Sequence, residues 1–169
     1  LEDNLYVTFD AKPSASARKS GNQTIAAATW TKLSPWIIDR QRPGNSVFFS
    51  SSTGVLTANQ DGIYRVSASV CFTPLSGDVL GIRLTSPDRN YVLAQQAVAK
   101  QYVYSEGPPI AVSEVSSAAG DTILSGTHDV YLLAGQQLTL EAYSLNGDTI
   151  VASDASGIKT LFSYEYIAG

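Results

Sequence analysis

The sequence GIYRVSASVCF, at residues 62–72, decides the fold. Large apolar side chains alternate along it with small or charged ones, a period of two that is typical of a strand with one buried face. One face carries the apolar residues Tyr64, Val66, Ala68, Val70 and Phe72. The other face carries Arg65, Ser67, Ser69 and Cys71. We therefore expect a long strand that buries its first face in a core.

The same period recurs further along the chain. Residues 78–86 alternate likewise, and residues 123–133 and 136–145 indicate a hairpin around Ala134-Gly135. We expect further strands at residues 5–11, 23–33, 47–58, 91–104 and 158–167. Residues 11–21, which read AKPSASARKSG, are polar enough for a mobile loop. Eight or nine strands with short turns and no helix pattern predict an all-β jelly-roll sandwich of two antiparallel sheets.

Length and composition limit the partners of the chain. Its 169 residues fit a single domain spanning residues 1–169. The net charge of −4 gives no basic surface for nucleic acid. No apolar run approaches the roughly 18 residues that a membrane-spanning helix needs, so we expect no membrane insertion. Because the sequence starts at Leu1 and has no Met, we expect this domain to be the C-terminal head of a longer chain.

Catalytic machinery is not visible in the sequence. The single histidine, His128, is in phase with Val130 and Leu132, so we expect it to point inward. There is no Gly-x-Ser-x-Gly turn, no group of histidines for a metal and no phosphate-binding glycine loop. The acids Asp148 and Asp154 stand in a Gly- and Ser-rich stretch, where solvated acids are far commoner than catalytic ones. We expect no enzyme, no metal and no cofactor.

Two tryptophans could stack on sugars. Trp36 follows Pro35 and is the better candidate for an exposed loop position, whereas Trp30 lies within an expected strand. A tryptophan that covers the edge of the sandwich is the commoner explanation for both.

Several stretches carry a resemblance to a known family. Gly62-Ile63-Tyr64 opens the alternating strand, and an aromatic residue with a Ser-Thr-Gly turn stands upstream at Phe49 and residues 52–54. Ser125-Gly126 is followed by VYLLAGQQL at residues 130–138, and the last strand contains LFSY at residues 161–164. By these motifs the chain resembles the globular heads of the complement system, whose fold is shared with tumour necrosis factor. No acidic cluster matches the calcium sites of that family.

The resemblance implies a tight homotrimer. A strand face of small residues with one arginine suits close approach by a neighbouring subunit. We therefore place the subunit contact on the first, fourth and last strands, with the residues Arg65, Ser67, Ser69, Cys71, Tyr164 and Tyr166. Since Cys71 lies mid-strand on this face, we expect a buried and unreactive thiol.

The order of the strands predicts which end of the molecule binds a ligand. If successive strands run antiparallel, the short turns at residues 59–62, 87–90 and 134–135 lie at one end with the C-terminus. The long loops at residues 12–21, 73–77, 101–120 and 146–157 then lie at the other end, where functional loops are expected. Tyrosines supply stiff contact area, and prolines lower the ordering entropy. We predict a ligand site there formed by Tyr102, Tyr104, Glu106, Pro108, Pro109, Asn146 and Asp148.

These features lead to three functional hypotheses. The first is a non-catalytic trimeric attachment head of a phage, viral or bacterial surface fibre or spike, outside the cell or on a virion, that recognises a host-surface glycan or protein. The alternative is a complement- or cytokine-like module that binds proteins. The third is a carbohydrate-binding module or carbohydrate-active enzyme.

Overall fold

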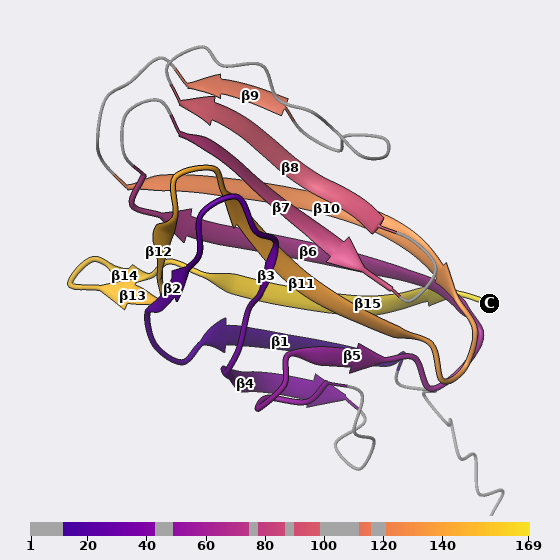
Figure 1. Ribbon diagram of the computed structural model, residues 1–169. Helices are drawn as coiled ribbons and strands as arrows, with labels where there is room; N and C mark the ends of the chain where they lie inside the picture. Colours follow the sequence, from indigo (N-terminus) through magenta and orange to yellow (C-terminus); the bar gives the residue numbers. More distant parts are fainter. Residues whose placement is uncertain (1–11, 43–48, 75–77, 87–89, 99–111, 116–120) are drawn as a thin grey trace, which may run out of the picture.

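The computed structural model describes residues 12–42, 49–74, 78–86, 90–98, 112–115 and 121–169. Within these ranges the chain is a sandwich of two large β-sheets and a small hairpin, without a helix (Figure 1). The predicted all-β sandwich is therefore confirmed. No helix in the described part is long and apolar enough to cross a membrane.

The first sheet has seven strands among the described residues. Along its main path the order is β2 (Gln23–Ile25), β12 (Asp148–Val151), β6 (Gly62–Phe72), β15 (Leu161–Ala168), β1 (Ser14–Lys19) and β4 (Trp36–Arg42). The strand β10 (Thr122–Leu132) pairs with β6 along its whole length. All these pairings are antiparallel.

The second sheet has six strands among the described residues. Its main path runs through β3 (Thr31–Lys32), β11 (Gln137–Ser144), β7 (Val79–Thr85), β8 (Asn90–Val98) and β9 (Val112–Val115), and β5 (Val55–Thr57) pairs with β11. Only β8 and β9 are parallel among these pairs. A short hairpin of β13 (Ser153–Asp154) and β14 (Gly157–Ile158) precedes the last strand.

The core lies between the two large sheets and follows the alternation of the sequence. The five residues expected on the buried face of β6 are all at most 5% exposed. Facing them from the second sheet are fully buried residues of β7 and β11, namely Leu80, Ile82, Leu84, Leu138, Leu140 and Ala142. Apolar burial of this kind is the main stabilising contribution to the fold.

The expected loop at residues 11–21 is wrong, because β1 occupies most of it. Ala15 and Ala17 face the core, and Lys19 follows them on the same face. The Lys19 ammonium donates hydrogen bonds to the carbonyl oxygens of Gly21, at 3.1 Å, and Ser34, at 2.8 Å. Burial lowers the pKa of Lys19. The strand is thus built from small and polar residues, and its sequence lacks the usual apolar signal.

Other boundaries differ from the expectation as well. The strand expected at residues 23–33 is split into β2 and β3 by a turn at Ala28, whose φ is 53°. The strand expected at residues 47–58 contracts to β5, while β4 and β12 were not predicted. The strands near β6, β7, β10 and β11 agree with the structure to within about two residues, within the usual uncertainty of strand ends. The strand expected at residues 5–11 lies outside the described residues.

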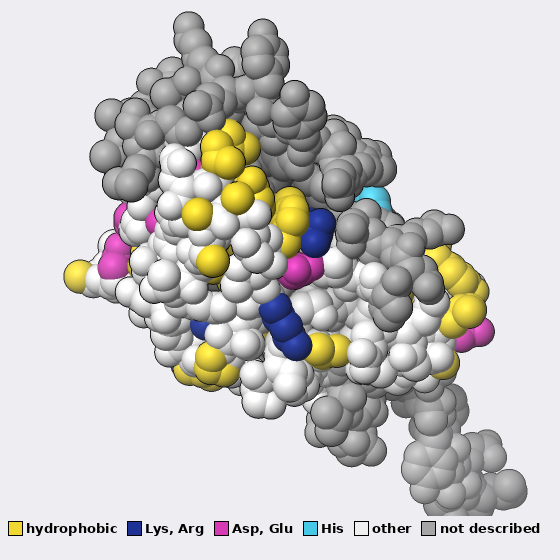
Figure 2. Space-filling model, viewed as in Figure 1, with side chains coloured by type: hydrophobic (Ala, Val, Ile, Leu, Met, Phe, Trp, Pro, Cys, Tyr) yellow, Lys and Arg dark blue, Asp and Glu magenta, His cyan; other side chains and the backbone are white. Residues whose placement is uncertain are grey.

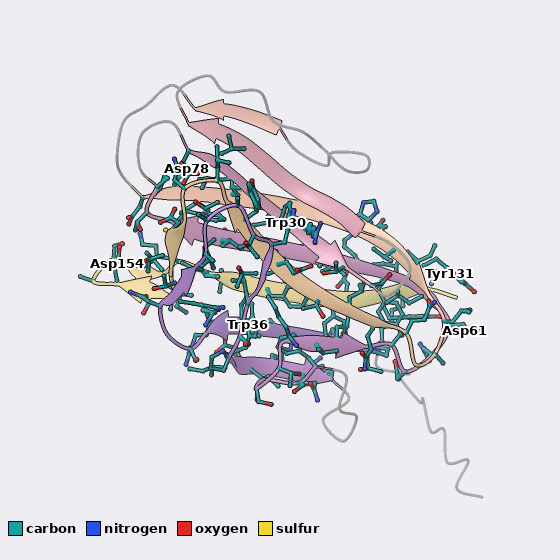
Figure 3. All side chains as sticks on the ribbon, viewed as in Figure 1. Trp30, Trp36, Asp61, Asp78, Tyr131 and Asp154 are labelled. Atoms are coloured by element: carbon teal, nitrogen blue, oxygen red, sulfur yellow. The ribbon has the colours of Figure 1, made fainter. Side chains whose placement is uncertain are left out.

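The predicted arrangement of turns holds in part. Lys12, expected at the end away from the C-terminus, instead donates its ammonium to the Ile167 carbonyl at 3.1 Å. The turns at residues 59–62 and 134–135 do lie together with the C-terminus. Gly135 donates its backbone N–H to Ala58, at 2.8 Å, and Ala134 donates to the Asp61 carboxylate, at 2.7 Å. Tyr166, near the C-terminus, donates its hydroxyl to the Asp61 carbonyl at 3.4 Å. Figure 3 shows Asp61 and Tyr131 at this end, with Asp78 and Asp154 at the opposite end.

Candidate functional site

The outer face of the seven-stranded sheet is lined by hydroxyl groups. The strand register places Ser16, Ser163, Ser67 and Thr127 in one row across β1, β15, β6 and β10. The hydroxyls of Ser67 and Thr127 are 3.0 Å apart, and Ser125 donates its hydroxyl to that of Ser69, also at 3.0 Å. Because these side chains are small, they leave two shallow hollows along the sheet. One of about 490 Å³ is lined in part by Ser16, Ser67 and Ser163, and one of about 400 Å³ in part by Ser69, Ser125 and Thr127.

Exposed apolar side chains flank this hydroxyl row on both sides. Ile63 and Tyr131 are register partners near the short turns, and Tyr131 is 59% exposed. Towards the other end lie Ile37, Leu161 and Ile123, which are 41–50% exposed. A gathering of exposed apolar side chains on one face is typical of an interaction surface. We call this surface, from Ile63 to Ile123, the hydroxyl face.

Two ion pairs on the hydroxyl face form within the chain. Arg65 donates hydrogen bonds to both carboxylate oxygens of Asp129, each at 2.9 Å. These hydrogen bonds hold the pKa of Asp129 below its usual value. Arg18 pairs with Asp39 at 3.0 Å. The face is therefore neither strongly acidic nor strongly basic at these positions.

The structure revises the predicted subunit contact. Arg65, Ser67 and Ser69 lie on the outer face of β6, as expected from the alternation. Tyr164, however, is 2% exposed and belongs to the core, and Tyr166 packs against that core. Both tyrosines share the inward face of β15, so its outward positions are Leu161, Ser163 and Glu165.

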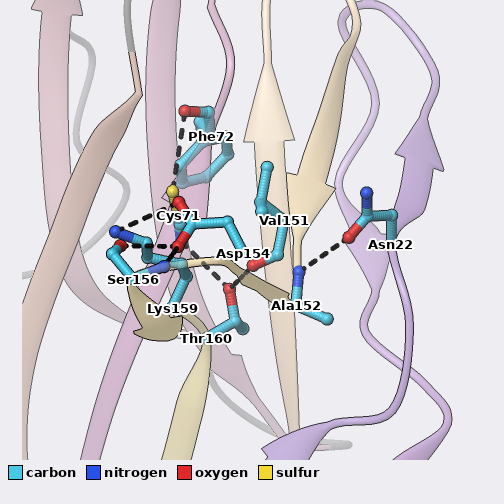
Figure 4. Close-up of polar contacts among 9 residues, drawn as sticks. All are labelled: Asn22, Cys71, Phe72, Val151, Ala152, Asp154, Ser156, Lys159 and Thr160. Carbon is cyan, nitrogen blue, oxygen red and sulfur yellow. Dashed lines mark hydrogen bonds and ion pairs between the residues drawn. The ribbon is translucent and has the colours of Figure 1, made fainter.

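Cys71 is fully buried, but its own chain covers it (Figure 4). The Cys71 backbone N–H donates to the Thr160 hydroxyl at 3.1 Å, and that hydroxyl donates to the Val151 carbonyl at 2.7 Å. Burial raises the pKa of Cys71 to about 11. The side chain therefore does not belong to the exposed hydroxyl face, whose small outward residues on β6 are Ser67 and Ser69.

At the long-loop end, the structure describes two of the predicted ligand residues, Asn146 and Asp148. Asp148 is 9% exposed, and one carboxylate oxygen accepts hydrogen bonds from the Thr73 N–H, the Thr73 hydroxyl and the Thr149 N–H. Burial raises the pKa of Asp148. The Asn146 side chain is exposed, while its N–H donates to Asp78 at 3.1 Å. The remaining predicted ligand residues lie outside the described residues: Tyr102, Tyr104, Glu106, Pro108 and Pro109.

Sequence reasoning missed Asp78, which ties two strands together at this end. Asp78 is fully buried and accepts hydrogen bonds from the Val79 N–H, the Ser144 hydroxyl and the Asn146 N–H, at 2.7, 2.6 and 3.1 Å. Only its place directly before β7 could have suggested such a role, since Asp often bonds to the backbone that follows it.

The groups considered for catalysis do not converge in the structure. His128 lies on the inward face of β10 and is partly buried, and burial lowers its pKa. Asp148 is buried beside Thr73, whereas Asp154 is exposed and pairs with Lys159 at 3.3 Å. In the described part of the chain, no group of three or more His, Cys, Asp or Glu side chains is placed to hold a metal ion.

The sequence favoured Trp36 over Trp30 as the exposed tryptophan, and the structure shows the reverse. Trp36 is 4% exposed, donates its indole N–H to the Leu33 carbonyl at 2.7 Å, and packs against Phe49 and Phe162. Trp30 instead lies on the outer face of the six-stranded sheet and is partly exposed (Figure 3).

Comparisons with known proteins identify the fold. No protein-family model and no curated protein matches the sequence. Among solved structures, Eiger TNF from S. frugiperda is 15% identical with a TM-score of 0.57, covering 93% of both chains. Murine APRIL is 11% identical with a TM-score of 0.58, covering 92% of this chain and 99% of that one. The globular domain of zebrafish complement 1qA is 13% identical with a TM-score of 0.52, covering 93% and 97%. The sandwich is thus a jelly roll of the kind seen in tumour necrosis factor and complement globular domains.

Proposed function

We propose that this chain is a non-catalytic binding head that forms a homotrimer through the hydroxyl face and attaches to a ligand on a host surface. The setting that fits best is the tip of a phage, viral or bacterial fibre or spike, outside the cell or on a virion. The observation that carries the proposal is the hydroxyl face itself, where exposed apolar side chains flank a row of small hydroxyls.

The physical reason is the cost of leaving this face in water. Covering apolar side chains such as Leu161 and Ile123 with a second copy of the chain removes them from water and lowers the free energy. Small hydroxyl side chains between them allow two backbones to approach closely. The ion pairs on the face are satisfied within one chain, so docking need not break them. A homo-oligomer of this kind normally closes with cyclic symmetry.

A second candidate is a cytokine- or complement-like module that binds protein receptors. The similarity in fold to Eiger TNF and to complement 1qA favours it. Both candidates predict self-assembly and differ in the ligand. A binding assay against intact host cells, with and without enzymatic removal of surface glycans, separates a glycan ligand from a protein ligand.

Self-assembly is tested by analytical ultracentrifugation at micromolar concentration. We expect a trimer for the natural sequence and folded monomers for Leu161→Glu, because the substitution places a charge in the apolar part of the contact. Leu145→Glu is the matched control, since Leu145 is also exposed but follows β11 in the other sheet. A stable monomer of the natural sequence would refute the proposal.

The proposed ligand site at the long-loop end needs its own test. Replacing Tyr102, Tyr104 and Glu106 together with Ala should reduce surface attachment while the trimer persists. If attachment is unchanged and fails instead on substitution of residues 59–62, the ligand binds at the opposite end.

A further inference from the structure

An ordered cluster of side chains lies on the outer face of the six-stranded sheet, away from the hydroxyl face. Trp30 directly precedes β3, and its ring reaches across β11 towards Gly81 on β7. Tyr143 and Gly81 are register partners beneath it. Figure 2 shows hydrophobic, basic and acidic side chains close together near the middle of this face.

The Trp30 ring is held from several sides. Its centroid is 5.2 Å from that of Tyr143, and the Arg83 guanidinium carbon lies 4.3 Å from the ring centroid. A Cβ atom added to Gly81 would come within 2.8 Å of the tip of the ring, so only glycine leaves room for it. The turn before Trp30 is fixed because Ala28 donates its N–H to Ser144 at 2.8 Å. Little ordering entropy would therefore be lost on binding.

Among the described residues, the cluster carries more positive than negative side chains. Arg83 pairs with Glu141 at 3.3 Å, and Glu141 also accepts a hydrogen bond from the Thr85 hydroxyl. Lys32 stands opposite Glu141 in the register, is exposed, and forms no ion pair among the described residues. In the described part of the chain the cluster thus holds two cations, Lys32 and Arg83, and one anion, Glu141, in a protein whose net charge is −4.

We propose that the cluster of Trp30, Lys32, Arg83, Glu141 and Tyr143 is a binding site for a carboxylate-bearing saccharide. The exposed parts of the two aromatic rings suit the apolar C–H face of a sugar ring. The Lys32 ammonium suits the carboxylate, and the largely buried Glu141 holds Arg83 in place beside the rings. A bare anion would make no use of the rings, and a neutral sugar would make no use of Lys32. The site does not rest on the trimer, because it lies on the other sheet.

The structure supplies a reporter for this site. Trp36 is buried in the core, so a change in tryptophan emission on adding a surface ligand reports on Trp30. We would titrate the full chain with sialyllactose and with its neutral counterpart, lactose, and measure emission and heat of binding. Sialyllactose should give a saturable change, and lactose should bind about tenfold more weakly or not at all.

Variants then test whether Lys32 binds the carboxylate of sialyllactose. Lys32→Gln should weaken sialyllactose binding about tenfold and leave lactose unaffected. Arg42→Gln is the matched control, since it removes the same charge from an exposed position on β4 in the other sheet. Trp30→Ala, followed by calorimetry, should abolish binding in a variant that circular dichroism shows to be folded.

Three results would overturn the proposal. One is the absence of saturable binding of sialyllactose up to millimolar concentrations. Another is equal affinity of Lys32→Gln, Arg42→Gln and the natural sequence, and the third is a folded Trp30→Ala variant with full affinity. If Trp30→Ala does not fold, the comparison of Lys32→Gln with Arg42→Gln decides. If sialyllactose does not bind but the protein is a trimer, the saccharide site is refuted and the proposed assembly is not.

Discussion

At the scale of single residues, buried polar groups hold the ends of strands in this sandwich. The Lys19 ammonium bridges the carbonyls of Gly21 and Ser34 at the end of β1. The Asp78 carboxylate joins the start of β7 to the end of β11 through Ser144. Each such group stabilises the fold only while its partners remain, because an unpaired buried polar group costs about 1–3 kcal/mol.

The Cys71 thiol should be unreactive in the native protein. Reaction with a disulfide reagent at pH 8 should be slow and become fast only on unfolding, since both access and thiolate formation are suppressed. The folded pKa of about 11 exceeds the unfolded value near 9.0. Burial therefore favours the neutral thiol, and this contribution to stability is complete below pH 9 and lost as the pH rises towards 11.

The measurement is the free energy of unfolding against pH, compared with Cys71→Ala. The natural sequence should lose more stability than the variant between pH 9 and 11. Rapid labelling of the native thiol without unfolding would contradict the buried position.

Gly81 should be needed for the position of Trp30. In Gly81→Ala the new methyl group meets the indole ring, so the ring must move, at a cost of about 1–3 kcal/mol. Its emission maximum should shift. Gly21→Ala is the control, because a Cβ atom at Gly21 has no neighbour within 4 Å. Equal emission spectra for the two variants would show that the ring is not held by this contact.

At the scale of whole elements, the strands differ in how visible they are in the sequence. β6, β7 and β11 have apolar residues at alternate positions, β10 has them near its end at Val130 and Leu132, and these strands were predicted closely. β1 buries only alanines and Lys19, so it has no apolar signal. β4 pairs with β1 across an irregularity in register at Ser16, which breaks the period of two. β12 is short and begins with the buried Asp148.

The same reasoning explains what could be predicted of the hydroxyl face. Ser67 and Ser69 were visible because they alternate with a clear apolar face. Their neighbours Ser163 and Thr127 come from β15 and β10, and the register between strands distant in sequence is not encoded in any local pattern. The Trp30 cluster was missed for the same reason, since it joins β3, β7 and β11.

The segment from Ala152 to Thr160 should act as a cover over Cys71. Thr160 is its anchor, because its hydroxyl bonds both the Cys71 N–H and the Val151 carbonyl. Thr160→Ala should therefore raise the rate of Cys71 labelling and lower stability by about 1–3 kcal/mol. Ser153→Ala, at an exposed position of the same segment, is the control. Unchanged labelling in both variants would mean that Cys71 is protected from elsewhere.

At the scale of the whole molecule, the two sheets present different outer faces. The seven-stranded sheet shows small hydroxyls with apolar residues, whereas the six-stranded sheet shows aromatic and charged residues. A trimer built on the first face would leave the second face of every copy available. Several weak contacts made by one trimer with the same surface would then combine into a higher overall affinity, or avidity.

Attachment should therefore depend on assembly more strongly than on any single contact. Leu161→Glu should lower the apparent affinity for a ligand-coated surface by about 10²–10⁴-fold, while affinity for the same ligand free in solution stays unchanged. Surface plasmon resonance at low and high ligand density measures both quantities. Equal losses at the two densities would show that the substitution damages the ligand site itself.

The covered Cys71 has a practical consequence for following this protein in experiments. The chain has one cysteine, and its thiol is shielded from the solvent. A cysteine introduced at an exposed position such as Asp121 would accept a maleimide dye without prior removal of the native one. Each copy would then carry a single fluorophore at a known place. Counting photobleaching steps on individual particles would report how many copies each particle contains.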